Sequence, residues 1–269
     1  MAFRDDLGRA RRLGLTGYVR YRRMRLANRL FRVVNLVGPN RHECPCCGWR
    51  GARFLDHVRE TYRMKAAVCP RCRSHSRHRG LALYLADLIP QLGPRCRVLH
   101  FAPERSLRRF FASLPELRYF GVDLGPRAAD ACADITAIPF REGAFDLVVA
   151  SHVIEHVGDD RAALGELARV TAPGGRMLIM VPMVPRWRER ATQEFGRPHP
   201  DYEGHWRIYG HDLADRIEAA GMRCETLSLA ALIDAERRGR FGIIDDALFV
   251  GEPASGAAHA IIAPFGERQ

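Results

Sequence analysis

The sequence predicts an α/β fold in which a mostly parallel sheet carries helices on both faces. Short apolar runs recur from Arg97 onward, and each is followed by a turn and polar residues. Continuous apolar runs, in contrast to alternating ones, are typical of parallel strands buried on both faces. Segments with helical spacing separate the runs. Two Cys-x-x-Cys motifs precede them and indicate a small module ahead of the main domain.

Length and composition suit one large domain with a small appendage, because 47% of the 269 residues are hydrophobic. No stretch reaches the ~20 apolar residues of a membrane span, and the first residues lack the apolar segment of a secretory signal. We therefore expect a cytoplasmic protein without a transmembrane segment. Residues 1–80 hold 20 Arg and Lys against 5 Asp and Glu, whereas residues 81–269 hold 22 against 26. The basic character thus belongs to the N-terminal part.

Residues 1–40 form a basic segment in which apolar positions between Tyr18 and Val37 follow helical spacing. One interpretation is an amphipathic helix that meets a membrane surface, an acidic glycan or a nucleic acid. The other is a helix packed on the protein's own body with solvated arginines. We favour the second, because a run of charge is commonly a solvated face.

Residues 41–80 contain two Cys-x-x-Cys pairs whose spacing indicates a zinc site in a zinc-ribbon-like module. Four thiolates complete a tetrahedral shell around Zn²⁺, and a closed shell of this kind is structural. Disulfides are the weaker alternative in a chain without a secretory signal. His42, His75 and His78 are alternative ligands. The predicted ligands are Cys44, Cys47, Cys69 and Cys72.

Residues 81–252 are predicted as the main domain, and residues 253–269 as a loosely ordered tail. Arg77, His78 and Arg79 come just before it, and they either bind an anionic substrate or join the two modules; we favour the joint. Residues 182–209 are predicted as a long insertion without periodicity. The predicted helices cover 81–89, 104–114, 160–171 and 212–220. The predicted strands cover 97–101, 118–124, a short segment before 134, 146–151, 176–181, 223–228 and 247–250.

Polar residues follow the predicted strands, where open α/β sheets bind ligands. Asp123 stands about 20 residues beyond the turn of the first strand, as does the acid that holds ribose hydroxyls in nucleotide-binding folds. The alternative is an acid that merely caps its loop. This spacing predicts a site for a nucleoside cofactor.

Several motifs together resemble the class I S-adenosylmethionine-dependent methyltransferases. They are His100-Phe-Ala-Pro-Glu, Val122-Asp123, Asp134-Ile135, Phe145-Asp-Leu-Val, Glu155-His-Val and Arg169-Val-Thr-Ala-Pro-Gly-Gly. The resemblance covers roughly the last two thirds of the chain, and it implies a Rossmann-like, mostly parallel, seven-stranded sheet. Within this family, the chain is more narrowly similar to bacterial members that carry a cysteine module ahead of the first motif.

The resemblance also implies cofactor-binding residues at the strand ends. His100 stands where the family has an acid, and Ala102 replaces a glycine that would let the backbone approach the ligand. Glu104 is positioned to pair with the methionyl ammonium, or else only suits the helix dipole. The remaining expected contacts are Asp123 and Leu124 at the ribose, Asp134 and Ile135 at adenine, and Ser151 near the methyl donor.

The segment from His205 to Tyr209 resembles the His-x-Arg-x-Tyr segment that the family places over its active site. His205 is the first candidate for general base, and Arg207 and Tyr209 are candidate substrate contacts. His152 and His156 follow the fourth strand and have suitable chemistry near neutral pH. The alternatives are a lid that only excludes water and, for His156, a hydrogen bond within its loop.

We expect an S-adenosylmethionine-dependent methyltransferase that acts on a hydroxyl or amine of a small molecule or glycan. A second hypothesis is a zinc-ribbon RNA methyltransferase, in which the basic module grips phosphates. A third is a non-catalytic binding protein on the same fold. The sequence does not specify the acceptor, the methylated atom or the oligomeric state.

Overall fold

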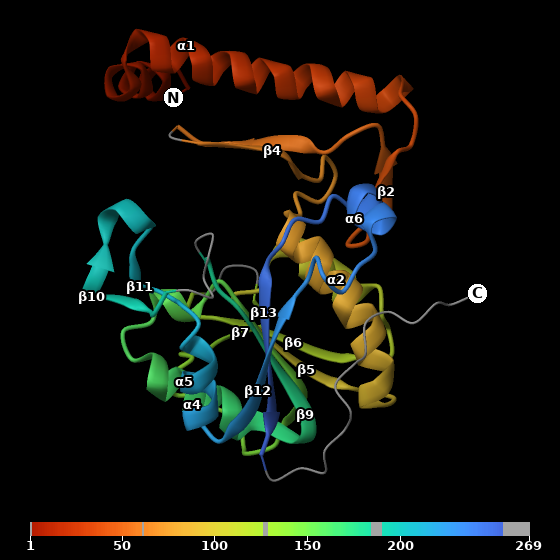
Figure 1. Cartoon of the computed structure of the whole chain (residues 1–269), viewed down its shortest axis with the longest axis vertical. Helices are drawn as coiled ribbons and strands as arrows, with labels where there is room; N and C mark the ends of the chain where they lie inside the picture. Colours follow the sequence, from red (N-terminus) through yellow and green to blue (C-terminus); the bar gives the residue numbers. More distant parts are fainter. Residues whose placement is uncertain (1, 61, 126–128, 184–189, 255–269) are drawn as a thin grey trace.

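A seven-stranded sheet forms the centre of the molecule in this computed structural model, which describes residues 2–60, 62–125, 129–183 and 190–254 (Figure 1). In the first helix, side chains are described from residue 11 onward. The strands follow the order β12-β13-β9-β8-β5-β6-β7. Strands β5 to β9 pair in parallel, whereas β13 runs antiparallel to both β9 and β12. The bounds are β5 Arg97–Phe101, β6 Arg118–Asp123, β7 Ala131–Cys132, β8 Phe145–Ser151, β9 Thr171–Met180, β12 Met222–Ser228 and β13 Ala247–Pro253.

Helices cover both faces of this sheet. Consecutive side chains of a strand point to opposite faces, and on these strands both sets are buried. One core cluster joins Val98, Leu147 and Val149 to helices α2 (Ser76–Leu88) and α3 (Arg105–Ala112). The neighbouring residues along the same strands pack instead against α4 (Asp160–Val170) and α5 (Leu213–Ala219). The predicted fold class is therefore confirmed. The predicted helices and strands of the main domain lie within a few residues of the observed bounds, except that α2 begins earlier, at Ser76, and β9 begins earlier, at Thr171.

The first helix, α1 (Ala2–Val37), crosses the top of the molecule in Figure 1, above the β3–β4 hairpin. Gly14, with φ of 66°, interrupts it in a backbone conformation that favours glycine. The face that carries Tyr21, Asn28 and Asn35 meets the hairpin. Asn28 binds the backbone of Asp56 through both amide atoms, at 2.8 and 2.9 Å. The favoured interpretation, a helix packed on the protein's own body, thus holds for this face.

Short antiparallel strands build the cysteine module: β1 (His42–Cys44) pairs with β2 (Trp49–Gly51), and β3 (Leu55–Val58) pairs with β4 (Arg63–Val68). The module rests on α6 (Ala235–Phe241), a helix between β12 and β13 that the sequence analysis did not predict. Glu43 pairs with Arg240 at 2.5 Å, and His42 contacts the Gly239 carbonyl at 3.0 Å. The module is therefore held from a segment far away in the sequence.

Arg79 joins this module to the main domain, as the sequence predicts for the segment around it. Its side chain is fully buried and lies over the Phe54 ring, 4.0 Å from the centroid. The guanidinium donates to the carbonyls of Ala67 and Ser74 in the module, and to those of Phe241 and Gly242 at the end of α6. A buried cation with all these acceptors acts as a fixed joint, because each bond lost would leave a buried carbonyl unpaired.

The expectation of an insertion without regular structure over residues 182–209 is wrong. Strands β10 (Gln193–His199) and β11 (His205–Ile208) form an antiparallel hairpin that stands to one side of the sheet in Figure 1. Gly196 and Pro198 in β10 disguise the strand, because both residue types are depleted in strands. Residues 184–189 of the insertion and the predicted tail from residue 255 lie outside the described residues. Among the helices that are described, none is both long and apolar enough to cross a membrane.

We predict that Arg79→Met lowers the free energy of unfolding by about 3 kcal/mol, because it keeps much of the aliphatic stem and removes every guanidinium hydrogen bond. Urea denaturation of the zinc-saturated protein measures the change. Arg118→Met is the matched control, because that side chain is exposed. Equal denaturation midpoints for the two variants would contradict the joint.

Candidate active site and metal centre

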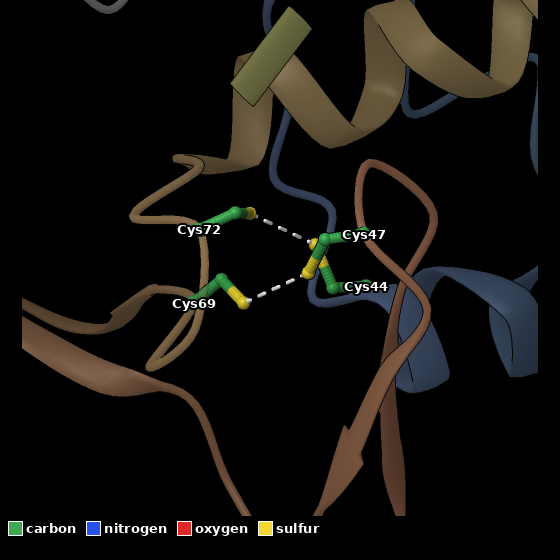
Figure 2. Close-up of side chains that lie close together, drawn as sticks. All are labelled: Cys44, Cys47, Cys69 and Cys72. Carbon is green, nitrogen blue, oxygen red and sulfur yellow. Dashed lines mark hydrogen bonds between the residues drawn. The ribbon is translucent and has the colours of Figure 1, made fainter. Parts of the chain in front are cut away.

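The four predicted cysteine ligands lie together at one point of the module (Figure 2). Their sulfur atoms all fall within 4.8 Å of one another, with 3.6 Å between Cys44 and Cys72 and 3.8 Å between Cys47 and Cys69. A tetrahedron of thiolates at the usual Zn–S bond length has S–S edges of about 3.8 Å. The geometry of the cluster therefore fits a zinc ion without rearrangement of the chain.

The surroundings of the cluster also suit a thiolate site. Hydrogen bonding to Cys44 lowers the pKa of the Cys47 thiol to about 7. Cys46, which the sequence analysis left outside the ligand set, instead contacts the carbonyl of His78 at 3.5 Å. Arg79 interacts electrostatically with the cysteines, and its positive charge would offset part of the net negative charge of a Zn(Cys)₄ centre. Within the described chain, His42, His75 and His78 are not part of this cluster.

The strand ends that the sequence predicts as a cofactor site meet at one edge of the sheet. Phe101 at the end of β5 is paired with Val122 of β6 on one side and with Ala150 of β8 on the other. The next residue of each strand is therefore a predicted site residue: Ala102, Asp123 and Ser151. Because these parallel strands end in register, the three residues lie side by side.

Two features of this edge are typical of a ligand-binding site. Ala102 has φ of 45°, in the left-handed region that favours glycine, and such strained backbone clusters at functional sites. The buried Ser151 hydroxyl has no hydrogen-bond partner in the described part of the chain. Asp123 is partly buried, and one carboxylate oxygen accepts from the Leu124 amide at 2.7 Å. Leu124 itself is exposed.

Glu104 stands at the N-terminus of α3 and is held by two histidines from different elements. His100 Nε2 lies 3.1 Å from one carboxylate oxygen, and His78 Nε2 lies 3.3 Å from the other. Burial alone would raise the pKa of Glu104, but the hydrogen bonds from His100 and His78 outweigh it and hold the pKa well below its usual range. His78 belongs to the segment that follows the cysteine cluster, so the cluster adjoins the predicted cofactor loop.

The next predicted pair, Asp134 and Ile135, follows β7. Asp134 accepts two hydrogen bonds from Thr136, both at 2.8 Å, and the backbone one is the main cause of the lowered pKa of Asp134. Ile135 is buried in the core cluster beneath the strand ends. Asp134 follows two residues after Cys132, which pairs with Asp123. Both acids thus lie at the edge of the sheet where the parallel strands end.

The three candidate catalytic histidines surround a carboxylate that the sequence analysis did not select. The rings of His156 and His205 meet edge to face, with centroids 4.7 Å apart. His152, with φ of 56°, places Nδ1 3.4 Å from Glu155 Oε1. Burial lowers the pKa of His205, which favours its neutral form near pH 7. The site thus collects nitrogen and oxygen donors from β11 and from the segment that follows β8.

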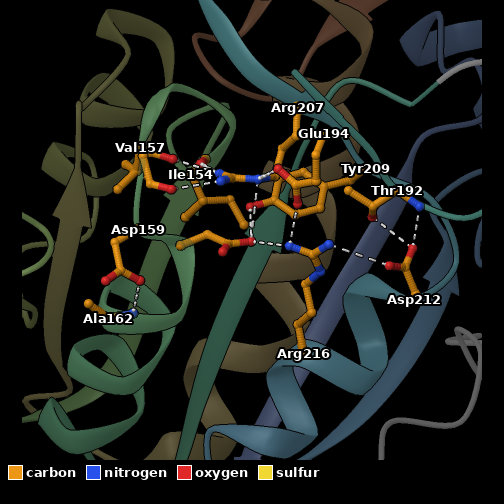
Figure 3. A network of polar contacts seen from close by, with 12 residues as sticks. Ile154, Val157, Asp159, Ala162, Thr192, Glu194, Arg207, Tyr209, Asp212 and Arg216 are labelled. Carbon is orange, nitrogen blue, oxygen red and sulfur yellow. Dashed lines mark hydrogen bonds and ion pairs between the residues drawn. The ribbon is translucent and has the colours of Figure 1, made fainter. Parts of the chain in front are cut away.

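Arg207 and Tyr209, predicted as substrate contacts, are instead buried in a network of protein contacts (Figure 3). Arg207 donates to the carbonyls of Val157 and Gly158, at 2.6 and 2.8 Å, and to Glu194 at 2.9 Å. Tyr209 donates to Asp160 at 2.9 Å. These bonds attach the β10–β11 hairpin to the loop before α4 and to the start of α4, and they leave both side chains turned into the protein. Arg207 and Tyr209 position His205 beside His156, and neither side chain faces an open surface.

Sequence reasoning missed Glu155 and His78 as members of the site. Glu155 belongs to the quoted Glu-His-Val motif, and that motif was the available signal. The sequence analysis interprets His78 as part of a joint between the modules or as an alternative zinc ligand. Its second contact, to Glu104, depends on how α2 packs beside α3, which spacing along the chain does not reveal.

Comparison with known proteins shows what the central segment is similar to. Residues 104–179 match the family model described as a methyltransferase domain. The demethylmenaquinone methyltransferase of Paenarthrobacter aurescens is 40% identical over 70 residues, which are 25% of this chain and 28% of that protein. The Thermus thermophilus enzyme of the same name is 48% identical over 48 residues, 18% of this chain and 22% of that protein. The chain thus covers about a quarter of the length of these relatives.

A search of solved structures finds the Burkholderia thailandensis 1,6-didemethyltoxoflavin-N1-methyltransferase with bound 1,6-didemethyltoxoflavin and S-adenosylhomocysteine. It is 14% identical, and the alignment covers 65% of this chain and 79% of that chain with a TM-score of 0.47.

We predict that the purified protein carries about one zinc ion per chain, held by four thiolates. Cys44→Ala should abolish stoichiometric zinc and lower the thermal midpoint, because metal binding contributes to folding free energy in such modules. Elemental analysis and thermal unfolding measure both effects. Cys132→Ala is the control, since that cysteine is exposed and outside the cluster. Full zinc content in Cys44→Ala would refute the assignment.

Proposed function

We propose that the chain transfers a methyl group from S-adenosylmethionine to an acceptor, because residues 104–179 match the family model described as a methyltransferase domain. The observation that carries the proposal is the alignment of Ala102, Asp123 and Ser151 at the carboxyl edge of the parallel strands. This is the edge at which open α/β sheets bind nucleotides.

Bound S-adenosylmethionine would supply an electrophilic methyl group on a sulfonium. Asp123 would accept hydrogen bonds from the ribose hydroxyls, and Asp134 would accept from the adenine amino group. Glu104, kept ionised by His78 and His100, would attract the methionyl ammonium. The Ser151 hydroxyl, buried without a partner among the residues described, would turn toward the cofactor.

We place the acceptor over the cluster of His152, His156 and His205, and we propose a hydroxyl or amine on a small molecule or glycan. Methyl transfer is an in-line displacement, so the main task of the chain is to position the two reactants. A proton acceptor is needed only when the nucleophile is protonated, and histidine is suited to that task near neutral pH. The names of the sequence relatives specify a small-molecule acceptor, which supports a small molecule over a glycan but does not bear on the atom that is methylated.

We predict that Asp123→Ala weakens the binding of S-adenosylhomocysteine by a factor of roughly 10 to 100, because charge-assisted hydrogen bonds to the ribose are lost. Isothermal titration calorimetry measures the change. Glu116→Ala, at an exposed acid away from the strand ends, should bind as the wild type does. If Asp123→Ala also binds with wild-type affinity, the ribose assignment is wrong. A wild-type protein that binds no cofactor would favour the non-catalytic hypothesis.

The outer face of α1 supports a second proposal, that the helix attaches the protein to an anionic membrane surface. Val19, Leu26, Leu30, Val33 and Val37 are 45–86% exposed, and their spacing places them on one stripe. This stripe lies opposite Tyr21 and Asn28, which meet the hairpin. Arginines at positions 20, 22, 23, 25, 29 and 32 flank it. Apolar area between cations is the pattern of interfacial helices, and it favours anionic lipid over a purely polar partner such as RNA.

We predict that the protein sediments with vesicles containing phosphatidylglycerol and not with vesicles of phosphatidylcholine alone. The triple variant L26E/L30E/V33E should lose this binding, because it removes apolar area and adds repulsion. Ile244→Glu, at another exposed apolar residue, is the control. If the triple variant still sediments, or if RNA binds and vesicles do not, the membrane proposal fails and the RNA-binding hypothesis takes its place.

A further inference from the structure

Glu155 is a buried carboxylate whose charge the protein leaves uncompensated by hydrogen bonds. Its side chain is 1% exposed, and neither carboxylate oxygen has a hydrogen-bond partner within the described ranges. A buried ionised group without compensation is costly, so native structures pair such groups or use them to coordinate metals. The histidine contact at Oε1 is His152 Nδ1, at 3.4 Å, which leaves Oε2 without a contact of this kind.

Two other histidines direct donor atoms at the same point. One ligand atom each from Glu155, His156 and His205 lies within 4.8 Å of the other two. His156 follows Glu155 on the short helical turn η2 (Ile154–His156), and His205 begins β11. Arg207 fixes the relation between these elements, because it lies on β11 and donates to the carbonyls of residues on both sides of His156. The three donors therefore belong to a braced arrangement.

We propose that Glu155, His156 and His205 bind a divalent first-row transition-metal ion. Two imidazoles and one carboxylate suit ions such as Fe²⁺, Co²⁺, Ni²⁺ or Zn²⁺, and they are poor ligands for Mg²⁺ or Ca²⁺, which prefer oxygen. Three protein ligands leave coordination positions open. The site differs in kind from the cysteine cluster, whose four thiolates would complete the shell of a structural ion. His156 is exposed, so the ion would be reached from solvent.

The role of this ion in the reaction rests on the proposed methyl transfer. An open position would hold the hydroxyl oxygen of the acceptor and make its proton easier to remove, as metal ions do for water. The proton would pass to solvent water, which reaches the site beside the exposed His156. The oxygen would then bond to the methyl carbon while the carbon–sulfur bond breaks. The electron pair of the broken carbon–sulfur bond would stay on sulfur. The inference thus selects a hydroxyl over a protonated amine, which has no lone pair for the ion.

Cobalt titration of zinc-loaded protein that carries a single equivalent of Zn²⁺, held by the cysteine cluster, tests the site. We expect one further equivalent of Co²⁺ to bind and to give weak d–d absorption without thiolate-to-cobalt charge transfer. Glu155→Gln and His205→Ala should each weaken this binding by more than roughly a hundredfold, since each removes a direct ligand. His211→Ala, at an exposed histidine outside the cluster, should leave it unchanged.

Two results would overturn the proposal: no second equivalent in the zinc-loaded wild type, or unaltered binding in either ligand variant. Circular dichroism identifies a variant that fails to fold, and the other variant then decides. Calorimetry with S-adenosylhomocysteine on the same samples separates the two proposals. Cofactor binding without a cobalt site would support the methyltransferase assignment and overturn the metal site. A cobalt site without cofactor binding would support the metal site and count against the methyltransferase assignment.

Discussion

The register of three parallel strands is the constraint on which the functional assignments depend. Strands β5, β6 and β8 end within one residue of each other across the sheet, so their next residues share an edge. A shift of one residue in a buried strand would turn its apolar side chains from one core cluster to the other. The register is therefore specified by packing on both faces, and the position of Asp123 beside Ala102 follows from the core rather than from the loops.

Two buried arginines attach the remaining pieces to this sheet in the same way. Arg79 binds carbonyls of the cysteine module and of the α6 terminus, while Arg207 binds carbonyls of the loop that carries Glu155 and His156. A guanidinium presents several donors in a rigid plane, so one side chain can satisfy carbonyls from separate segments. Both module and hairpin thereby adjoin the strand ends. His78, which contacts Glu104, extends this connection from the cysteine cluster to the cofactor edge.

The sheet and the cysteine cluster could be predicted from the sequence because each has a local signal. Apolar runs identify β5 and β8, and the spacing of Cys44 to Cys72 identifies the four sulfur ligands. The hairpin, α6 and the buried roles of Arg207 and Tyr209 could not be predicted. An arginine in a motif looks the same whether it faces a ligand or backbone carbonyls, since only tertiary packing decides which. Glu155 lies within the Glu-His-Val motif. Its burial beside three histidines could not be predicted, because it depends on β11, about 50 residues later.

Because β13 completes the sheet between β9 and β12, the growing polypeptide on a ribosome holds an incomplete sheet for most of its synthesis. Strands β5 to β9 can assemble early, but β9 keeps one edge of unpaired amide and carbonyl groups until residues near 253 emerge. Open edges of this kind invite pairing with other chains. A strand order in which the last strand enters between two earlier ones is therefore expected to make folding during translation depend on chaperones.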